Sequence, residues 1–185
     1  MRIKLSAFVF CVTSVLAFSL PASAATIVIG VNGSAQACYW AAKGQDTTAL
    51  KICATALSEK LTPRDHAATL INRSALLIKA LDYRGGLADC DESIRTYPSL
   101  GEAYLNRGVA LRELGELQAS IEALNKGLAV GLNRPQLAYY DLAIAKEDLG
   151  DTKGAYHDYK MALQLEPDFQ LAAEQLKRFR VTSGA

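Results

Sequence analysis

The chain has 185 residues, and its 20 lysines and arginines against 19 acidic residues give a formal net charge of +1. A nearly neutral chain without a basic stripe cannot neutralise many phosphates, so the composition argues against nucleic-acid binding. The length is typical of one domain preceded by a short N-terminal segment.

The first 24 residues have the pattern of a secretory signal peptide. Residues 1–4 are basic, residues 5–20 are almost continuously apolar, and Ala22-Ser23-Ala24 is a small-residue cleavage site. The alternative is an uncleaved membrane anchor, but the apolar run is shorter than the roughly 20 residues that span a bilayer. We therefore expect an exported protein, periplasmic or secreted, whose mature chain begins at Ala25 and contains no membrane span.

Residues 25–33 are the next predicted element, an extended or flexible strap. Thr26-Ile27-Val28-Ile29 is rich in β-branched side chains, and Asn32-Gly33 after it is a turn signal. We expect the strap to lie on the helices that follow it. Disorder and pairing with another chain are the alternatives.

Residues 34–61 have the apolar spacing of a helical hairpin with a turn near Gly44. Cys38 lies six residues before Gly44 and Cys53 nine after it, so the two cysteines are at similar heights above the bend. In an oxidising compartment they should form a disulfide; the alternative is two buried thiols that pack as small hydrophobic groups. Cys90, the third cysteine of the mature chain, is interpreted as a core residue.

A period of 34 residues organises the rest of the chain, in three units at residues 67–100, 101–134 and 136–169. Positions four, eight and eleven of a unit share one helical face, and so do positions twenty, twenty-four and twenty-seven. Each unit therefore predicts two amphipathic helices. The eighth and twentieth positions are small, which lets the two backbones approach: Ser74, Gly108 and Ala143, and Gly86, Ser120 and Ala155.

Glycines mark the turn between the two predicted helices of a unit. Gly115 and Gly150 stand at matching positions, where a left-handed backbone ends a helix at low cost. In the first unit, Leu81 and Asp82 stand there instead.

This pattern resembles the tetratricopeptide repeat, in the exported bacterial type that carries a signal peptide. The resemblance implies an all-α, right-handed α-solenoid of antiparallel helix pairs with three full repeats. Residues 34–61 would be a degenerate first pair, and residues 170–181 a capping helix. No single hairpin buries its apolar side alone, so stacking of consecutive units makes the core.

The resemblance also implies where a partner binds. In such repeats the first helix of each pair lines a concave groove that holds a protein or peptide, without a cofactor. Carried onto this sequence, the candidate groove residues are Ile71, Asn72, Leu105, Asn106, Val109, Arg112, Tyr140, Asp141 and Ile144.

The family's basic clamp for a peptide carboxylate is largely missing from these positions. Ile71 and Ala75 replace its lysine and asparagine, and Asp141 stands where a basic residue is expected. Asn72 and Asn106 match the clamp, with either a binding or a structural role. The neighbouring Arg73 and Arg107 are interpreted as residues that cover apolar surface and join charges between adjacent units; the alternative is a ligand motif.

No residue constellation predicts catalysis or metal binding. His66 and His157 fall at unrelated points of the repeat, and Asp89, Asp91 and Glu92 are interpreted as a solvated helix face. The sequence therefore predicts a non-enzymatic, exported scaffold that binds a protein or peptide. The alternative is a structural repeat protein that forms a homo-oligomer.

Overall fold

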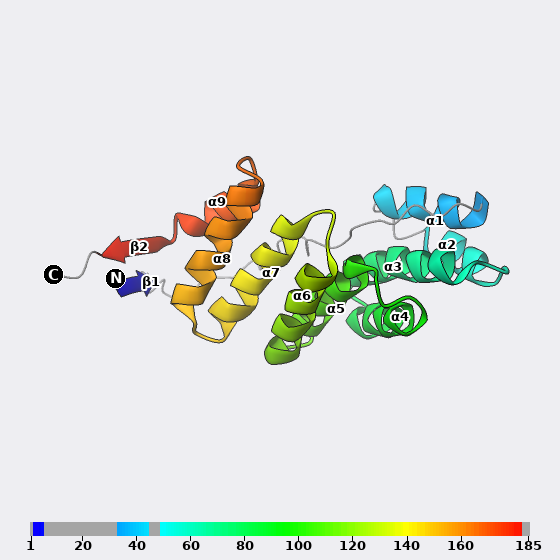
Figure 1. Cartoon of the computed structure of the whole chain (residues 1–185), viewed down its shortest axis with the longest axis horizontal. Helices are drawn as coiled ribbons and strands as arrows, with labels where there is room; N and C mark the ends of the chain where they lie inside the picture. The colour runs from blue at the N-terminus through cyan, green and yellow to red at the C-terminus, as the bar shows by residue number, and fades with distance from the viewer. Residues whose placement is uncertain (1, 6–32, 45–48, 183–185) are drawn as a thin grey trace, which may run out of the picture.

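The computed structural model of the protein describes residues 2–5, 33–44 and 49–182, which form nine helices and two short strands (Figure 1). Residues 6–24 of the predicted leader and 25–32 of the predicted strap lie outside this description. Consecutive helices pack against each other as hairpins, so the predicted α-solenoid of helix pairs is confirmed. The elements are α1 (Gly33–Lys43), α2 (Leu50–Leu57), α3 (Pro63–Lys79), α4 (Tyr83–Thr96), α5 (Gly101–Glu113), α6 (Leu117–Val130), α7 (Pro135–Asp148), α8 (Thr152–Leu165), α9 (Gln170–Leu176), β1 (Arg2–Leu5) and β2 (Phe179–Thr182).

Small residues let the two helices of each repeat approach. The Ser120 hydroxyl on α6 donates a hydrogen bond of 2.7 Å to the carbonyl oxygen of Gly108 on α5. A Cβ atom at Gly108 would lie 2.5 Å from Cγ of Leu124, so no larger residue fits there without displacing that leucine. The 34-residue spacing of small side chains thus sets the helix contacts.

The turns within the repeats differ in strain. Gly115 and Gly150 have φ angles of +82° and +83°, the left-handed conformation that glycine adopts freely. Leu81, at the same place in the first repeat, has a φ angle of +65°, where its Cβ is crowded by the backbone. The first repeat therefore begins its second helix from a less favourable turn.

Three helices form a continuous inner row. Besides its hairpin partner, α3 contacts α5, and α5 contacts α7. The outer helices α4 and α6 pack on the next inner helices, α5 and α7. Because successive inner helices touch directly, we take the side formed by α3, α5 and α7 as the concave side of the array.

The first hairpin, α1 with α2, is closed by the disulfide between Cys38 and Cys53. Cys38 Sγ lies 3.8 Å from the carbonyl oxygen of Thr69, so the disulfide also packs on α3. The surrounding core contains three alanines, Ala42, Ala49 and Ala56, and one large side chain, Leu76 of α3. Because alanine buries little apolar area, the disulfide is a large part of what holds this hairpin together.

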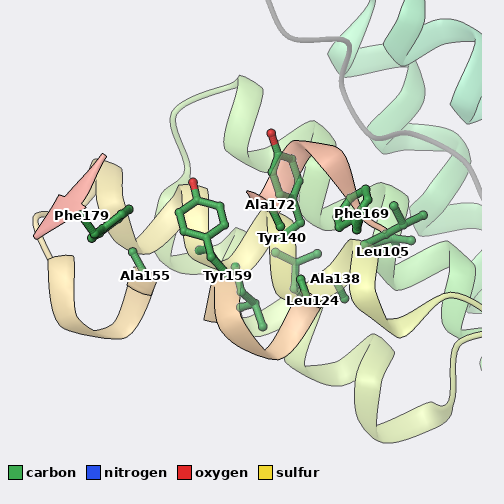
Figure 2. Packing of buried hydrophobic residues seen from close by; sticks show 13 residues of the cluster. Leu105, Leu124, Ala138, Tyr140, Ala155, Tyr159, Phe169, Ala172 and Phe179 are labelled. Carbon is green, nitrogen blue, oxygen red and sulfur yellow. The ribbon is translucent and has the colours of Figure 1, made fainter. Parts of the chain in front are cut away.

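The opposite end of the array has an aromatic core, the C-terminal cluster (Figure 2). Its largest members are Tyr140 on α7, Tyr159 on α8, Phe169 before α9 and Phe179 at the start of β2. Ring centroids are 5.4 Å apart for Tyr140 and Phe169, and 5.8 Å for Tyr140 and Tyr159. Large rings that contact one another at tilted angles make this end well packed.

The last segment differs from the predicted capping helix over residues 170–181. Helix α9 ends at Leu176, and β2 begins at Phe179. Phe179 is only 8% exposed, and its ring centroid lies 5.8 Å from that of Tyr156 and 5.9 Å from that of Tyr159. We attribute the early helix end to this ring, which is buried against α8 by an extended backbone.

The strand β2 pairs with β1 in antiparallel orientation. The register places Arg2 opposite Thr182 and Leu5 opposite Phe179. The two strands therefore meet beside α8, at the end of the array opposite α1 (Figure 1).

Candidate partner-binding groove

The predicted groove residues all lie on the inner helices α3, α5 and α7, but most of their side chains are buried. Only Arg112 and Ile144 are partly exposed. The others are between 0% and 2% exposed: Ile71, Asn72, Leu105, Asn106, Val109, Tyr140 and Asp141. The repeat positions identify the inner row, but they do not identify which of its side chains are accessible.

The apolar candidates hold the inner helices together. Ile71 on α3 packs with Ala103 on α5, and Val109 on α5 packs with Ile78 on α3. Leu105 and Tyr140 belong to the C-terminal cluster, against which Ile144 packs from the surface. These contacts give the residues a role in stacking successive repeats.

Asn106 has a structural role between two repeats. Its Nδ2 donates to the Ser74 hydroxyl oxygen at 3.0 Å and to the Ile71 carbonyl oxygen at 3.3 Å. Its Oδ1 is buried and accepts no hydrogen bond from the described part of the chain. The acceptor Oδ1 of Asn106 is thus unsatisfied within the described part of the chain.

Arg112 and Asp141 form an ion pair between α5 and α7. The nearest nitrogen and oxygen are 3.3 Å apart, and a second guanidinium nitrogen lies 2.8 Å from a carboxylate oxygen of Glu113. The Asp141 side chain is only 1% exposed, whereas that of Arg112 is 13% exposed. The pair therefore neutralises a buried carboxylate at the stacking interface.

The accessible part of the inner side lies at the C-terminal ends of its helices. We call this set the open row: Lys79, Arg112, Glu113, Ile144, Glu147 and Asp148. Four of these residues are absent from the predicted set: Lys79, Glu113, Glu147 and Asp148. They hold the twelfth and thirteenth repeat positions, at the ends of the inner helices. The open row carries charges of both signs around one apolar side chain.

Arg107 joins charges between adjacent units, as predicted: it lies 2.7 Å from Asp91 of the preceding repeat. Arg73 instead pairs within its own repeat, 2.6 Å from Asp89. The hydrogen bond to Asp89 raises the pKa of Arg73. The predicted solvated face is wrong at Asp89, which is 6% exposed and turned toward Arg73.

Titratable groups near the inner row are held in one protonation state. Burial raises the pKa of Tyr140, and burial together with the nearby Glu147 raises that of Tyr159. Cys90 on α4 is fully buried, and the loss of solvation raises its pKa to about 12. These phenols and this thiol stay protonated at neutral pH, which suits packing rather than proton transfer.

A metal site and a membrane-spanning helix are two further features to consider in the described part of the chain. In residues 2–5, 33–44 and 49–182, no three His, Cys, Asp or Glu side chains are grouped so that they could hold a metal ion. No helix in this same part of the chain combines the length and the apolar character needed to cross a membrane.

Comparison with known proteins agrees with the geometry. Residues 101–130, which cover α5 and α6, match the model of the tetratricopeptide repeat family. The Arabidopsis OM64 TPR domain superposes with a TM-score of 0.60 at 23% identity, over 63% of this chain and 96% of that domain. The crystal structure of MamA gives a TM-score of 0.60 at 18% identity, over 76% of this chain and 91% of MamA.

A third similar structure contains a ligand. The first TPR of Spaghetti (RPAP3), bound to the HSP90 peptide SRMEEVD, has a TM-score of 0.58 at 21% identity. The match covers 62% of this chain and 90% of that one. At these identities the likeness establishes the fold alone: the described helices have the architecture of TPR domains, and residues 101–130 match one tetratricopeptide repeat.

Proposed function

We propose that the protein is an exported, non-enzymatic scaffold that binds a protein or peptide along α3, α5 and α7. The observation that carries this proposal is the open row, which runs over the ends of all three inner helices. A rigid row of side chains from successive repeats suits an elongated ligand.

The chemistry of the row favours a peptide-like partner. Ile144 offers an apolar contact, while Lys79 and Asp148 are exposed charges of opposite sign. An apolar side chain between charges of both signs suits a peptide, which presents apolar and charged side chains along an extended backbone.

The solved relative with a bound HSP90 peptide supports the same class of partner. Its ligand cannot be carried over residue by residue, because the clamp positions hold Ile71, Ala75 and Asp141 in this chain. We therefore propose a partner without a dominant contact to a C-terminal carboxylate.

Export is supported by the leader pattern of residues 1–24 and by the buried disulfide of the first hairpin. Intact-mass measurement of protein purified from the cell envelope should give a chain that starts at Ala25 and retains the Cys38–Cys53 bond. A chain that keeps Met1 or has free thiols at both positions would contradict export.

A photo-crosslinking amino acid tests the groove without disturbing the buried residues. Placed at Lys79 or Ile144 in the envelope protein, it should crosslink one and the same partner. Asn125, exposed on the outer helix α6, is the matched control and should give no such product. Crosslinking from Asn125 but not from Lys79 or Ile144 would move the site to the outer face.

The second candidate, a repeat protein that assembles with itself, is favoured by a different feature, the strand at the C-terminal end.

A further inference from the structure

The pairing of β1 with β2 shows that the C-terminal end of the array accepts a strand. Four consecutive residues of β2, from Phe179 to Thr182, are paired in register with four residues of β1. Phe179 fixes β2 to the array through its contacts with Tyr156 and Tyr159. The acceptor strand is thus held by the helical core as well as by β1.

In the mature protein that we propose, β1 is missing. Its residues, Arg2–Leu5, belong to the segment removed by cleavage after Ala24. Removal leaves the edge of β2 with unpaired backbone N–H and C=O groups, which readily pair with another extended chain. The inference that follows rests on this proposed cleavage.

The mature chain contains one segment with the properties of a replacement strand. Residues 26–31, Thr-Ile-Val-Ile-Gly-Val, are rich in β-branched side chains, and Ile27, Ile29 and Val31 share one face of an extended strand. The removed strand, Arg-Ile-Lys-Leu, likewise has apolar residues at every second position.

This segment cannot reach β2 of its own chain. Only Asn32 separates Val31 from Gly33, the first residue of α1. Between α1 and β2 lie α3, α5, α7 and α8, and neighbouring helix axes are about 8–10 Å apart. One residue spans about 3.5 Å, so a second copy of the chain has to supply the strand.

The surface beside β2 suits the apolar face of such a strand. A hollow of about 480 Å³ lies along α8, the helix that β1 also contacts. Tyr156 and Met161 line it, together with the stems of Lys153 and Lys160, and Tyr156 also contacts Phe179. The hollow is therefore adjacent to the strand-pairing edge.

We propose that residues 26–31 of one mature chain pair with the edge of β2 in a second copy, in the place that β1 occupies in the uncleaved chain. This brings α1 of the donor to the C-terminal end of the acceptor. Trp40 and Ile52, 55% and 43% exposed on the first hairpin, then come close to the neighbouring array. Donor and acceptor surfaces differ, so each added copy leaves a free strap and a free edge, and the assembly grows head to tail.

Two complementary variants of the mature chain test the pairing. In the acceptor-only variant, Ile27→Pro and Ile29→Pro remove the strap's ability to form a ladder; in the donor-only variant, Arg180→Pro and Val181→Pro do the same for β2. Neighbouring strand residues point their N–H groups to opposite edges, so the double change includes the edge that β1 occupies. Both variants keep every helix and Phe179.

Sedimentation velocity should show the mature protein as a concentration-dependent series of oligomers. Each variant alone should be monomeric, and an equimolar mixture should give a heterodimer and nothing larger. Circular dichroism should show unchanged helix content in both. A mature protein that is monomeric at about 100 µM, well above ordinary weak association, or variants that still form the series, would overturn the proposal.

The results of this sedimentation experiment can be distinguished from those of the crosslinking experiment on the groove. A crosslinking product at Lys79 and Ile144 with a strictly monomeric mature chain would leave the scaffold function intact and refute the strand exchange. Assembly that persists while those positions give no partner would refute the groove and support the strand exchange.

Discussion

The two ends of the array stabilise an exposed terminus in different ways. The first hairpin has a core of alanines around the Cys38–Cys53 disulfide, with Leu76 as its one large buried side chain. The C-terminal cluster instead has aromatic rings packed at tilted and edge-on angles, among them Tyr140, Tyr159 and Phe169. The terminal unit of a solenoid lacks one neighbour, and here a covalent bond offsets that loss at one end and aromatic packing at the other.

The largest expected effect comes from the aromatic end. Phe169→Ala should lower the free energy of unfolding by about 3–4 kcal/mol, because it removes a ring that packs on Tyr140 and leaves a cavity. Urea denaturation measures this. Trp40→Ala is the matched control: Trp40 is 55% exposed, so its loss should change stability by less than about 0.5 kcal/mol. Equal effects of the two changes would show that the aromatic cluster does not stabilise its end.

Removing the disulfide should have a slightly smaller effect, confined to the other end. Cys38→Ala with Cys53→Ala opens a loop with a sequence separation of 15 residues. For that length the chain-entropy cost is about 3 kcal/mol. Hydrogen exchange should become fast in α1 and α2 and stay slow in α7 and α8. Cys90→Ala, which leaves the disulfide intact, should keep α1 and α2 protected; retained protection in the double variant would contradict the prediction.

A gain in stability is expected at the turn of the first repeat. Leu81→Gly should stabilise the protein by about 1 kcal/mol, because it relieves a left-handed leucine whose side chain is 68% exposed. Leu149→Gly is the control, since Leu149 is also exposed and has a φ angle of −81°. It should destabilise by up to about 1 kcal/mol. Thermal melts that shift in the same direction for both variants would exclude strain at Leu81.

The smallest expected effect is at Cys90. With a pKa of about 12, its thiolate fraction at pH 8 is roughly one in ten thousand, so iodoacetamide should not label it in the folded protein. Its raised pKa should also reduce stability once the pH exceeds the unfolded value of about 8.5. Mass spectrometry after labelling with and without urea measures accessibility; rapid labelling without urea would mean that α3 and α4 open locally.

The helix pairs could be predicted because their signals are local. The small residues at Gly108 and Ser120 and the turn glycines Gly115 and Gly150 each act within a single repeat. The 34-residue period shows small residues in all three units and the turn glycine in two, because Leu81 stands at that position in the first unit. The disulfide could also be predicted, because Cys38 and Cys53 face each other across one hairpin.

The burial of the inner row, the end of α9 and the pairing of β1 with β2 could not be predicted, because they depend on contacts that the 34-residue period does not indicate. Repeat position places Leu105 and Tyr140 on the inner row, but their burial depends on how closely α5 and α7 pack. The end of α9 at Leu176 depends on Phe179 finding Tyr156 and Tyr159 on α8. The pairing of β1 with β2 joins segments near the two ends of the sequence. Both segments lie outside the repeats, so the 34-residue period does not predict their contact.

The buried thiol of Cys90 has a consequence for how the protein matures. Three cysteines allow three single pairings, and wrong pairs are corrected by thiolate attack on a disulfide. Once α3 packs on α4, the Cys90 sulfur is neither ionised nor within reach, so it cannot exchange with the bond in the first hairpin. Packing of α3 on α4 thus protects the Cys38–Cys53 bond from exchange with the third thiol.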